Sequence, residues 1–189
     1  MLRKADMLTV GIDEVGRGCL AGPVVAACVI LPENFSDERL IDSKKIPEKQ
    51  RRLLDGVIRA NAVAIGIGLV DNSTIDEINI LNSTKRAMMD ALGQITVEYH
   101  KVIVDAVNLG DLKVPMEHPF KAEDKFQCVA AASIVAKVFR DALMTKMHIE
   151  YPDYDWYSNK GYGTKKHTDA IRKLGLTPLH RVSFCGNFI

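Results

Sequence analysis

Apolar positions divide the first third of the chain into three predicted strands and one helix. Apolar residues alternate with other residues from Leu8 to Asp13, which is typical of a strand with one buried face. An almost unbroken apolar run from Gly22 to Ile30 predicts a central strand that is buried on both faces. Pro47 suits a first helical turn, and apolar residues then recur at helical spacing over residues 48–61. Residues 62–70 alternate well enough to predict a third strand.

Helical spacing dominates the remainder of the chain. The pattern predicts, in order, a helical turn capped by Ser73 or Thr74, a helix over 82–92, a strand over 101–105, an edge strand over 112–115, a long helix over 128–151 and a last helix over 164–174. Pro152 ends the long helix because proline cannot continue its hydrogen bonding. Strands come first, strands and helices then alternate, and helices come last. We therefore predict an α/β fold in which helices flank a mixed β-sheet, with a helical C-terminal region.

Composition narrows the class of protein. Of the 189 residues, 47% are hydrophobic and 26% are charged, as in an ordinary globular domain. No apolar run approaches the ~18–20 residues of a membrane span, and residues 1–6 lead into a strand rather than into the apolar region of a signal peptide. The four cysteines show no C-x-x-C spacing, so we expect free thiols and a cytoplasmic protein.

Charge is distributed unevenly although the net charge is only +1. Residues 160–181 contain six lysines and arginines but a single acid, Asp169. Such a stretch can form a surface that faces phosphate groups. An ordinary solvated helix face explains the same charges, so charge alone leaves both interpretations open.

Carboxylates stand where predicted elements begin or end. Asp13 and Glu14 end the first strand, Asp105 ends a later strand, and Glu123 and Asp124 precede the long helix. In open α/β sheets, sites form outside the carboxyl ends of strands, so we expect these acids to converge. A single acid at a helix start also has a structural explanation, because it complements the helix dipole.

Four carboxylates around one point would bind two Mg²⁺ or Mn²⁺ ions. Hard cations prefer oxygen ligands, and two ions roughly 3.5–4 Å apart suit an in-line phosphoryl displacement. The sequence contains no competing nucleophile elbow, H-E-x-x-H helix, Walker loop or dinucleotide-binding loop.

Short motifs add a resemblance that covers residues 8–184. They are Asp13–Gly18 with Gly22-Pro23, Asp42–Lys45, Asn79–Leu81 with Ala87-Met88, Val104-Asp105, Ala130–Ile134 with Ala136-Lys137 and Arg140-Asp141, Lys160–Thr164, and His180-Arg181 with Ser183-Phe184. Each is weak alone, but in this order they closely resemble type 2 ribonucleases H, the ribonuclease HII family.

The resemblance implies a ribonuclease H-like catalytic domain over residues 1–150, with residues 151–189 as a helical substrate-binding extension packed on it. It implies an endoribonuclease that hydrolyses the RNA strand of RNA–DNA hybrids. It also implies incision 5′ to single ribonucleotides in duplex DNA, which leaves 3′-hydroxyl and 5′-phosphate ends. The matching metal-binding carboxylates are Asp13, Glu14 and Asp105.

The fourth acid departs from the family pattern. The family usually has aspartate seven residues before the alanine-serine segment, where this chain has Glu123. We predict Glu123 as the fourth catalytic acid because it keeps the register, with Asp124 as the alternative. Ribonuclease HIII commonly carries glutamate there, so hybrid cleavage without junction preference is an alternative specificity. HII is favoured because HIII has an extra N-terminal domain and only about seven residues precede the first strand here.

The resemblance also supplies the predicted substrate-binding residues. Gly16, Arg17 and Gly18 match the loop that contacts the ribose, and Tyr162 matches the tyrosine that senses the junction. Basic residues are candidate phosphate contacts, namely Lys44, Lys45, Lys160, Lys165, Lys166 and Arg181. We expect a monomer that acts on RNA–DNA hybrid and on ribonucleotide-containing duplex DNA. A non-catalytic nucleic-acid-binding protein on the same fold is the rival from another class, and retention of the acids argues against it.

Overall fold

A computed structural model describes residues 7–189, in which five strands form one mixed sheet. The strands are β1 (Thr9–Val15), β2 (Val24–Ile30), β3 (Ala64–Val70), β4 (Lys101–Val104) and β5 (Met116–Glu117). Their order across the sheet is β3-β2-β1-β4-β5, with β2 antiparallel to both β1 and β3, and β4 parallel to both β1 and β5. This arrangement confirms the predicted mixed sheet. The prediction about residues 1–6 lies outside the described residues.

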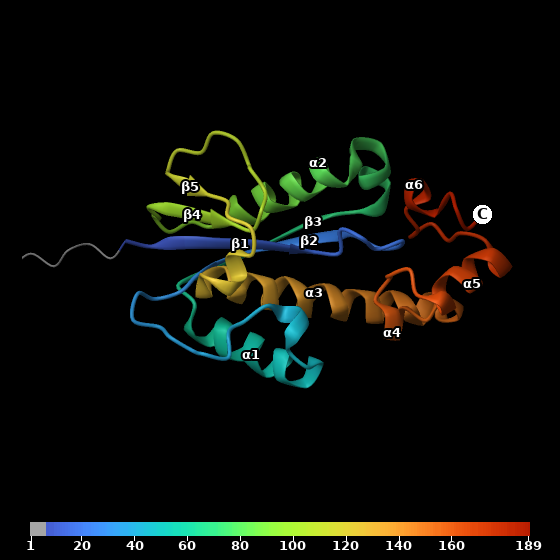
Figure 1. The fold of residues 1–189 in the computed structure, drawn as a ribbon, viewed down its shortest axis with the longest axis horizontal. Helices are drawn as coiled ribbons and strands as arrows, with labels where there is room; N and C mark the ends of the chain where they lie inside the picture. Colours follow the sequence, from blue (N-terminus) through green and yellow to red (C-terminus); the bar gives the residue numbers. More distant parts are fainter. Residues whose placement is uncertain (1–6) are drawn as a thin grey trace, which may run out of the picture.

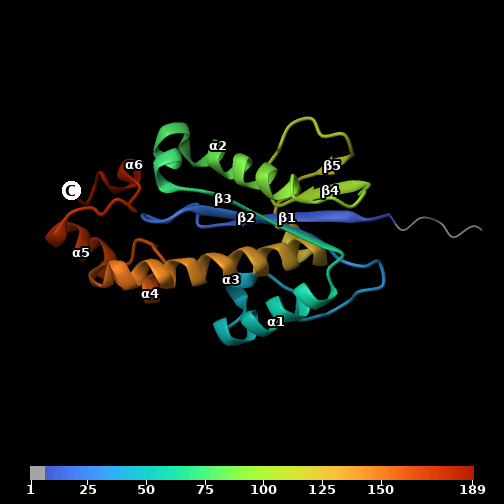
Figure 2. The ribbon, with the colours of Figure 1, turned by 180° about the vertical axis from the view of Figure 1, so that it is seen from behind.

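Helices cover both faces of the sheet (Figure 1). They are α1 (Glu48–Asn61), α2 (Asn72–Leu92), α3 (Gln127–Glu150), α4 (Trp156–Asn159), α5 (Lys165–Leu174) and α6 (Val182–Cys185), with 3₁₀ turns η1 (Ser43–Lys45), η2 (Ala122–Asp124) and η3 (Pro152–Tyr154). Seen from behind in Figure 2, α2 lies on one face, while α3 lies on the other with α1 beside it. None of the helices in the described part of the chain is long and apolar enough to cross a membrane.

The central strand β2 is buried on both faces, as its apolar run predicts. Val24, Ala26, Cys28 and Ile30 join the core beneath α2, and the residues between them join the core beneath α3. The two cores follow from the alternation of side chains along a strand. They hold β1 and its acids between two packed layers.

Helix α3 approaches β1 almost to backbone contact. A Cβ added to Gly11 in β1 would stand 2.2 Å from the carbonyl carbon of Cys128. The first turns of α3 carry Ala130, Ala131 and Ala132, all fully buried. Small side chains on both sides let the helix backbone lie close to the strand that carries Asp13.

Several predicted boundaries are wrong. Strand β1 continues through Val15, so Asp13 and Glu14 lie within the strand rather than at its end. The edge strand forms at β5 and not over 112–115, and α6 was not predicted. The turn after Ser73 and the next helix run together as α2, with a kink at Asn79 (φ 67°). The Asn79 side chain accepts hydrogen bonds from two backbone N–H groups beyond it, so it starts the second part of the helix.

The C-terminal segment packs at one end of the sheet, drawn in red in Figure 1. Trp156 and Ile171 are buried against Leu20 and Ala21, which follow β1, and against Met144 of α3. The predicted cap of the last helix is confirmed, because the Thr164 hydroxyl accepts from a backbone N–H of α5. The segment after residue 150 therefore lies against the residues that follow the first strand.

Candidate active site

Asp13 and Glu14 leave β1 on opposite faces of the sheet. Asp13 pairs with Ala27 and shares its face beneath α3, whereas Glu14 pairs with Ala26, which faces α2. Asp13 is buried, and the Glu14 side chain is 11% exposed. Asp105 follows β4 and donates its backbone N–H to Ile12. The strand pairing therefore places Asp105 next to both acids of β1.

Burial and mutual repulsion disfavour the charged form of these acids. Burial raises the pKa of Asp13 well above its ordinary value, and the neighbouring charges of Glu14 and Asp105 raise it further. Burial also raises the pKa of Glu14, opposed by the Arg17 guanidinium, whose Nη1 lies 3.3 Å from Oε1. Buried carboxylates that repel one another form a site that a cation would stabilise.

The two candidates for the fourth acid occupy different surroundings. Burial raises the pKa of Glu123, and Asp105 adds repulsion. Asp124 instead pairs with Lys45, with Oδ1 2.9 Å from Nζ, and a hydrogen bond from that lysine lowers its pKa. The structure therefore brings Glu123, and not Asp124, to the other acids.

Asp105 connects the members of this carboxylate group. Its charge raises the pKa of Asp13, of Glu14 and of Glu123. One of its oxygens, Oδ1, accepts the backbone N–H of Ala122 at 3.0 Å, which ties the end of β4 to the turn that carries Glu123. The β4–η2 connection thus positions Glu123.

The donor set fits divalent cations. Buried Oε2 atoms of Glu14 and Glu123 have no hydrogen-bond partner among residues 7–189, and carboxylate oxygens are the ligands that Mg²⁺ and Mn²⁺ prefer. In the same part of the chain, no group of three or more His, Cys, Asp or Glu side chains is already arranged to hold a metal ion.

Sequence reasoning missed one polar residue at this site. Ser133 of α3 is buried, its hydroxyl lies 2.9 Å from that of Ser43, and its hydrogen bond lowers the pKa of Asp13. It follows three alanines on the face that packs on β1. A single hydroxyl in such an alanine run is the signal that could have identified it.

A hollow of about 250 Å³ adjoins the acids. It is lined by Glu14, Val15, Gly16, Arg17, Gly18, Lys44 and Tyr162. Tyr162 reaches it through an isolated β-bridge to Cys19. The predicted ribose-contacting loop and the predicted junction tyrosine, far apart in sequence, therefore line one cavity beside a carboxylate.

Tyr162 keeps its proton in this hollow. Burial raises its pKa to about 12. Its ring lies 5.6 Å from Lys137 Nζ and 5.9 Å from Arg140 Cζ, which supports the ring from the protein side. At neutral pH the side chain therefore offers a neutral ring face and a hydroxyl donor.

The predicted phosphate contacts divide into exposed and buried residues. Lys44, Lys45, Lys165 and Lys166 are exposed, and the last three pair with Asp124, Asp169 and Asp155 respectively. These lysines remain able to exchange a surface carboxylate for a phosphate.

Two of the basic residues are wrong as phosphate contacts. Arg181 has no exposed surface, and its guanidinium donates to backbone carbonyls. Lys160 is also buried, with Nζ bonded to the Tyr157 carbonyl and to Thr145. Their side chains satisfy backbone and hydroxyl acceptors of the protein, which leaves Lys160 little exposed surface and Arg181 none.

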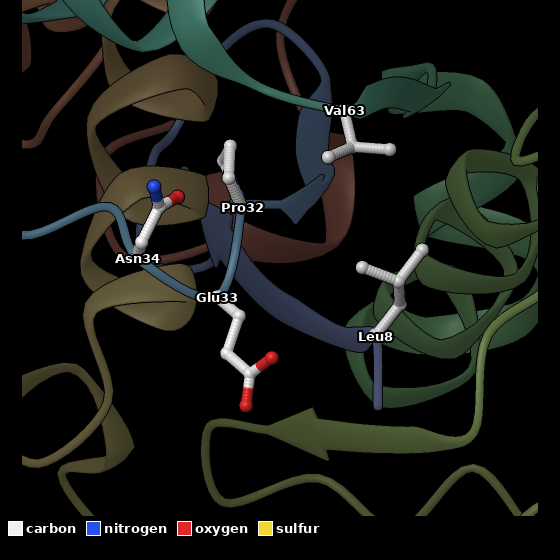
Figure 3. Close-up of a pocket in the computed structure, with 5 residues that line it drawn as sticks. All are labelled: Leu8, Pro32, Glu33, Asn34 and Val63. Atoms are coloured by element: carbon white, nitrogen blue, oxygen red, sulfur yellow. The ribbon is translucent and has the colours of Figure 1, made fainter. Parts of the chain in front are cut away.

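A larger hollow lies at the opposite end of β1 and has a volume of about 470 Å³ (Figure 3). It is lined by Leu8, Pro32, Glu33, Asn34 and Val63. Glu33 is its only ionisable side chain. A lone carboxylate without a partner offers neither an acid–base pair nor a set of metal ligands, so size does not mark the reactive site here.

Comparison with known proteins gives consistent matches. The sequence pattern of the family described as Ribonuclease HII matches residues 10–187. The chain is 50% identical over 182 residues to a protein named Ribonuclease HII from Acetivibrio thermocellus, covering 96% of this chain and 71% of that protein.

Among solved structures, the fold is similar to the ribonuclease H2 of Pyrococcus horikoshii, with a TM-score of 0.81 and 24% identity over 96% of this chain and 97% of that one. It is also similar to Bst-RNase HIII in complex with Mn²⁺, with a TM-score of 0.69 and 20% identity over 92% of this chain and 64% of that one. At these identities the two structures show a shared fold.

Proposed function

The chain belongs to the ribonuclease HII family, and on that premise we propose that it incises duplex DNA on the 5′ side of a single embedded ribonucleotide. Family membership itself makes it a ribonuclease of RNA–DNA substrates. The proposal adds the junction specificity, the ends it leaves (3′-hydroxyl and 5′-phosphate), and a role in removing ribonucleotides from DNA.

One observation carries this proposal. The hollow beside Glu14 is lined by Gly16, Arg17 and Gly18 together with Tyr162. A 2′-hydroxyl distinguishes RNA from DNA, and the backbone of the glycine loop, residues 16–18, could recognise it by direct contact. The Tyr162 ring could lie against the sugar that follows, where a second 2′-hydroxyl would be crowded.

The four acids supply the chemical part of the proposal. Asp13, Glu14, Asp105 and Glu123 would hold two divalent ions, Mg²⁺ or Mn²⁺. When bound, such ions activate a water and stabilise the leaving 3′-oxygen. The related ribonuclease HIII structure with Mn²⁺ supports this choice of ion. The raised pKa values of Asp13 and Glu14 support it too, because a bound cation removes their repulsion.

The exposed lysines complete the substrate contacts. Lys44 lines the hollow, and Lys45 and Lys165 lie on the exposed surface. Contacts to phosphate would orient the duplex without reading its sequence and would make binding weaker at high salt.

The test uses a DNA duplex with one ribonucleotide, incubated with Mg²⁺ or Mn²⁺. We expect a cut 5′ to the ribonucleotide and none in the matched all-DNA duplex. A protein that cuts a continuous RNA–DNA hybrid but leaves the single ribonucleotide intact would have HIII-like specificity, and the junction proposal would be wrong. Binding of both duplexes without any cut would indicate a non-catalytic binding protein.

A further inference from the structure

Arg181 is a buried cation whose hydrogen-bond partners are backbone carbonyls rather than a carboxylate. Its guanidinium donates to the carbonyl of Gly16 at 2.7 Å, of Arg17 at 2.8 Å and of Gly22 at 2.9 Å. No Asp or Glu of residues 7–189 forms an ion pair with it. Burial lowers its pKa to about 10, so it stays charged at neutral pH.

Arg140 of α3 also donates to backbone carbonyls, at the other end of the loop that runs from Gly16 to Pro23. It is fully buried and donates to the carbonyls of Ala21, Pro23 and Lys160. The two guanidiniums therefore hold carbonyls at both ends of the stretch from Gly16 to Pro23. The guanidiniums of Arg140 and Arg181, which are distant in sequence, thus hold in position a loop that forms no regular strand or helix.

The C-terminal segment places Arg181 against this loop. The Arg181 backbone N–H donates to Leu20 at 2.8 Å, and the Gly22 N–H donates to Leu179 at 2.9 Å. An isolated β-bridge joins Ala21 to His180. Because the backbone is paired on both sides of residue 181, its side chain enters the loop from a fixed position.

Peptide geometry then decides which groups face the hollow. The peptide bonds of residues 7–189 are all trans, and in a trans peptide the carbonyl and the following N–H point in opposite directions. Arg181 holds the carbonyls of Gly16 and Arg17 inward, so the N–H groups of Arg17 and Gly18 point away from the buried guanidinium. Neither N–H has an acceptor within the described chain.

The same three residues line the hollow beside Glu14. Gly16 has φ +92°, a conformation that favours glycine, and a Cβ there would stand 2.2 Å from Arg140 Nε. The residues that carry the two backbone donors therefore line the cavity, while the carbonyls of Gly16 and Arg17 stay bonded to Arg181.

We propose that Arg181 is a specificity-determining positioning residue, which orients the Arg17 and Gly18 N–H groups toward the 2′-hydroxyl oxygen of the ribonucleotide. The inference rests on the proposed junction incision. Arg181 touches no substrate, since it acts through the two peptide planes that it holds. Lysine could not replace it, because an ammonium lacks the planar fork that reaches several carbonyls at once.

The first test compares Arg181→Lys with Arg51→Lys. Arg51 is also buried, and it donates to Asp141 and to the Ile46 carbonyl but to no carbonyl of the loop. Cleavage rates are measured on a duplex with one ribonucleotide and on a continuous hybrid, together with the melting temperature. One 2′-hydroxyl must be recognised in the first substrate, whereas every position offers one in the second.

We expect Arg181→Lys to lower the ratio of single-ribonucleotide to hybrid cleavage about 10-fold, the value of one lost hydrogen bond. Arg51→Lys should lower the melting temperature but leave the ratio unchanged. Equal loss on both substrates for Arg181→Lys would reduce Arg181 to a structural residue and overturn the proposal.

A second measurement needs no variant. Amide NMR signals of Arg17 and Gly18 are followed in the wild-type protein with Ca²⁺, which neutralises the carboxylates. Both signals should shift with a duplex that contains one ribonucleotide and not with all-DNA duplex. The absence of a ribonucleotide-dependent shift would overturn the proposal even if Arg181→Lys fails to fold.

The two proposals fail in distinguishable ways. If the wild type cuts hybrid but not the single ribonucleotide, the junction function is wrong. The amide signals are then compared between hybrid and all-DNA duplex. A difference at Arg17 and Gly18 that is lost in Arg181→Lys still supports the positioning role of Arg181, whereas no difference overturns it.

Discussion

Glu123 and Asp124 are neighbours in sequence, yet their carboxylates have different partners. Glu123 faces Asp105 and has a raised pKa, whereas Asp124 is exposed and paired with Lys45. The 3₁₀ turn that carries both begins after Lys121, whose φ is 56°. This local backbone turn, rather than residue type, separates a candidate metal ligand from a surface ion pair.

Glu123→Gln should therefore lower turnover of hybrid substrate by at least about 100-fold, the usual cost of removing one group that stabilises the transition state. Asp124→Asn should change it by less than a few-fold. Both are measured as kcat in Mg²⁺ at fixed pH. Loss of turnover with Asp124→Asn alone would mean that Asp124 closes the site.

The role of Tyr162 at the junction can be tested by removing its ring. Tyr162→Ala should weaken cutting at a single ribonucleotide about 10-fold more than in continuous hybrid, since stacking on one sugar or base is worth on the order of 1–3 kcal/mol. Tyr162→Phe keeps the ring and serves as control. If alanine slows both substrates equally, Tyr162 has no role at the junction.

The pairing of β1 with α3 decides whether the acids are held in place. Gly11 admits the helix backbone, and two residues further along the strand Asp13 meets Ser133 of the same helix. The strand and the helix therefore act as one support. A substitution that moves α3 away from β1 would therefore also move the Asp13 carboxylate away from its hydrogen-bond donor, Ser133.

Gly11→Ala should destabilise the fold by about 3 kcal/mol, because the added methyl group meets backbone and not a flexible side chain. Gly56→Ala in α1 is the control, since nothing lies within 4 Å of its Cβ position, and alanine favours helix by about 0.5–1 kcal/mol. Chemical denaturation measures both. A Gly11→Ala protein as stable as wild type would show that α3 can move off the strand at little cost.

At the scale of the whole molecule, the clustering of buried carboxyl groups at the site lowers the stability of the fold. Burial raises the folded-state pKa of Asp13 above its unfolded value of about 4. The contribution of protonated Asp13 to the stability of the fold is therefore fully present below pH ~4 and is lost as the pH rises through the folded-state pKa. Without bound cations, the wild type should be penalised at neutral and alkaline pH.

Asp13→Asn should consequently melt at a higher temperature than wild type at pH 8 in EDTA, with the difference shrinking toward pH 4. Thermal unfolding across this range measures it. Asp124→Asn is the control, because Lys45 lowers the pKa of Asp124 and its removal should give no such gain. A lower melting temperature for Asp13→Asn at pH 8 would show that the hydrogen bonds of Asp13 outweigh its burial.

Local pattern by itself determined most of the elements and the order of the motifs. The period of apolar residues predicted α1, α3 and the central strands to within a few residues, because side-chain spacing reflects the geometry of a single element. It misplaced the end of β1 and the edge strand, since pairing with a neighbouring strand, and not the period, sets where a strand ends.

Only the tertiary structure decided which of these residues are buried and which are exposed. Arg181 and Lys165 are both basic residues of one short stretch, yet the first is buried under the glycine loop and the second is exposed. Glu123 and Asp124 differ in the same way. Burial and partners depend on how distant segments pack, and that information is absent from local spacing. The sequence therefore identified the candidate chemical groups, and the packing of distant segments decided which of them are buried and which are exposed.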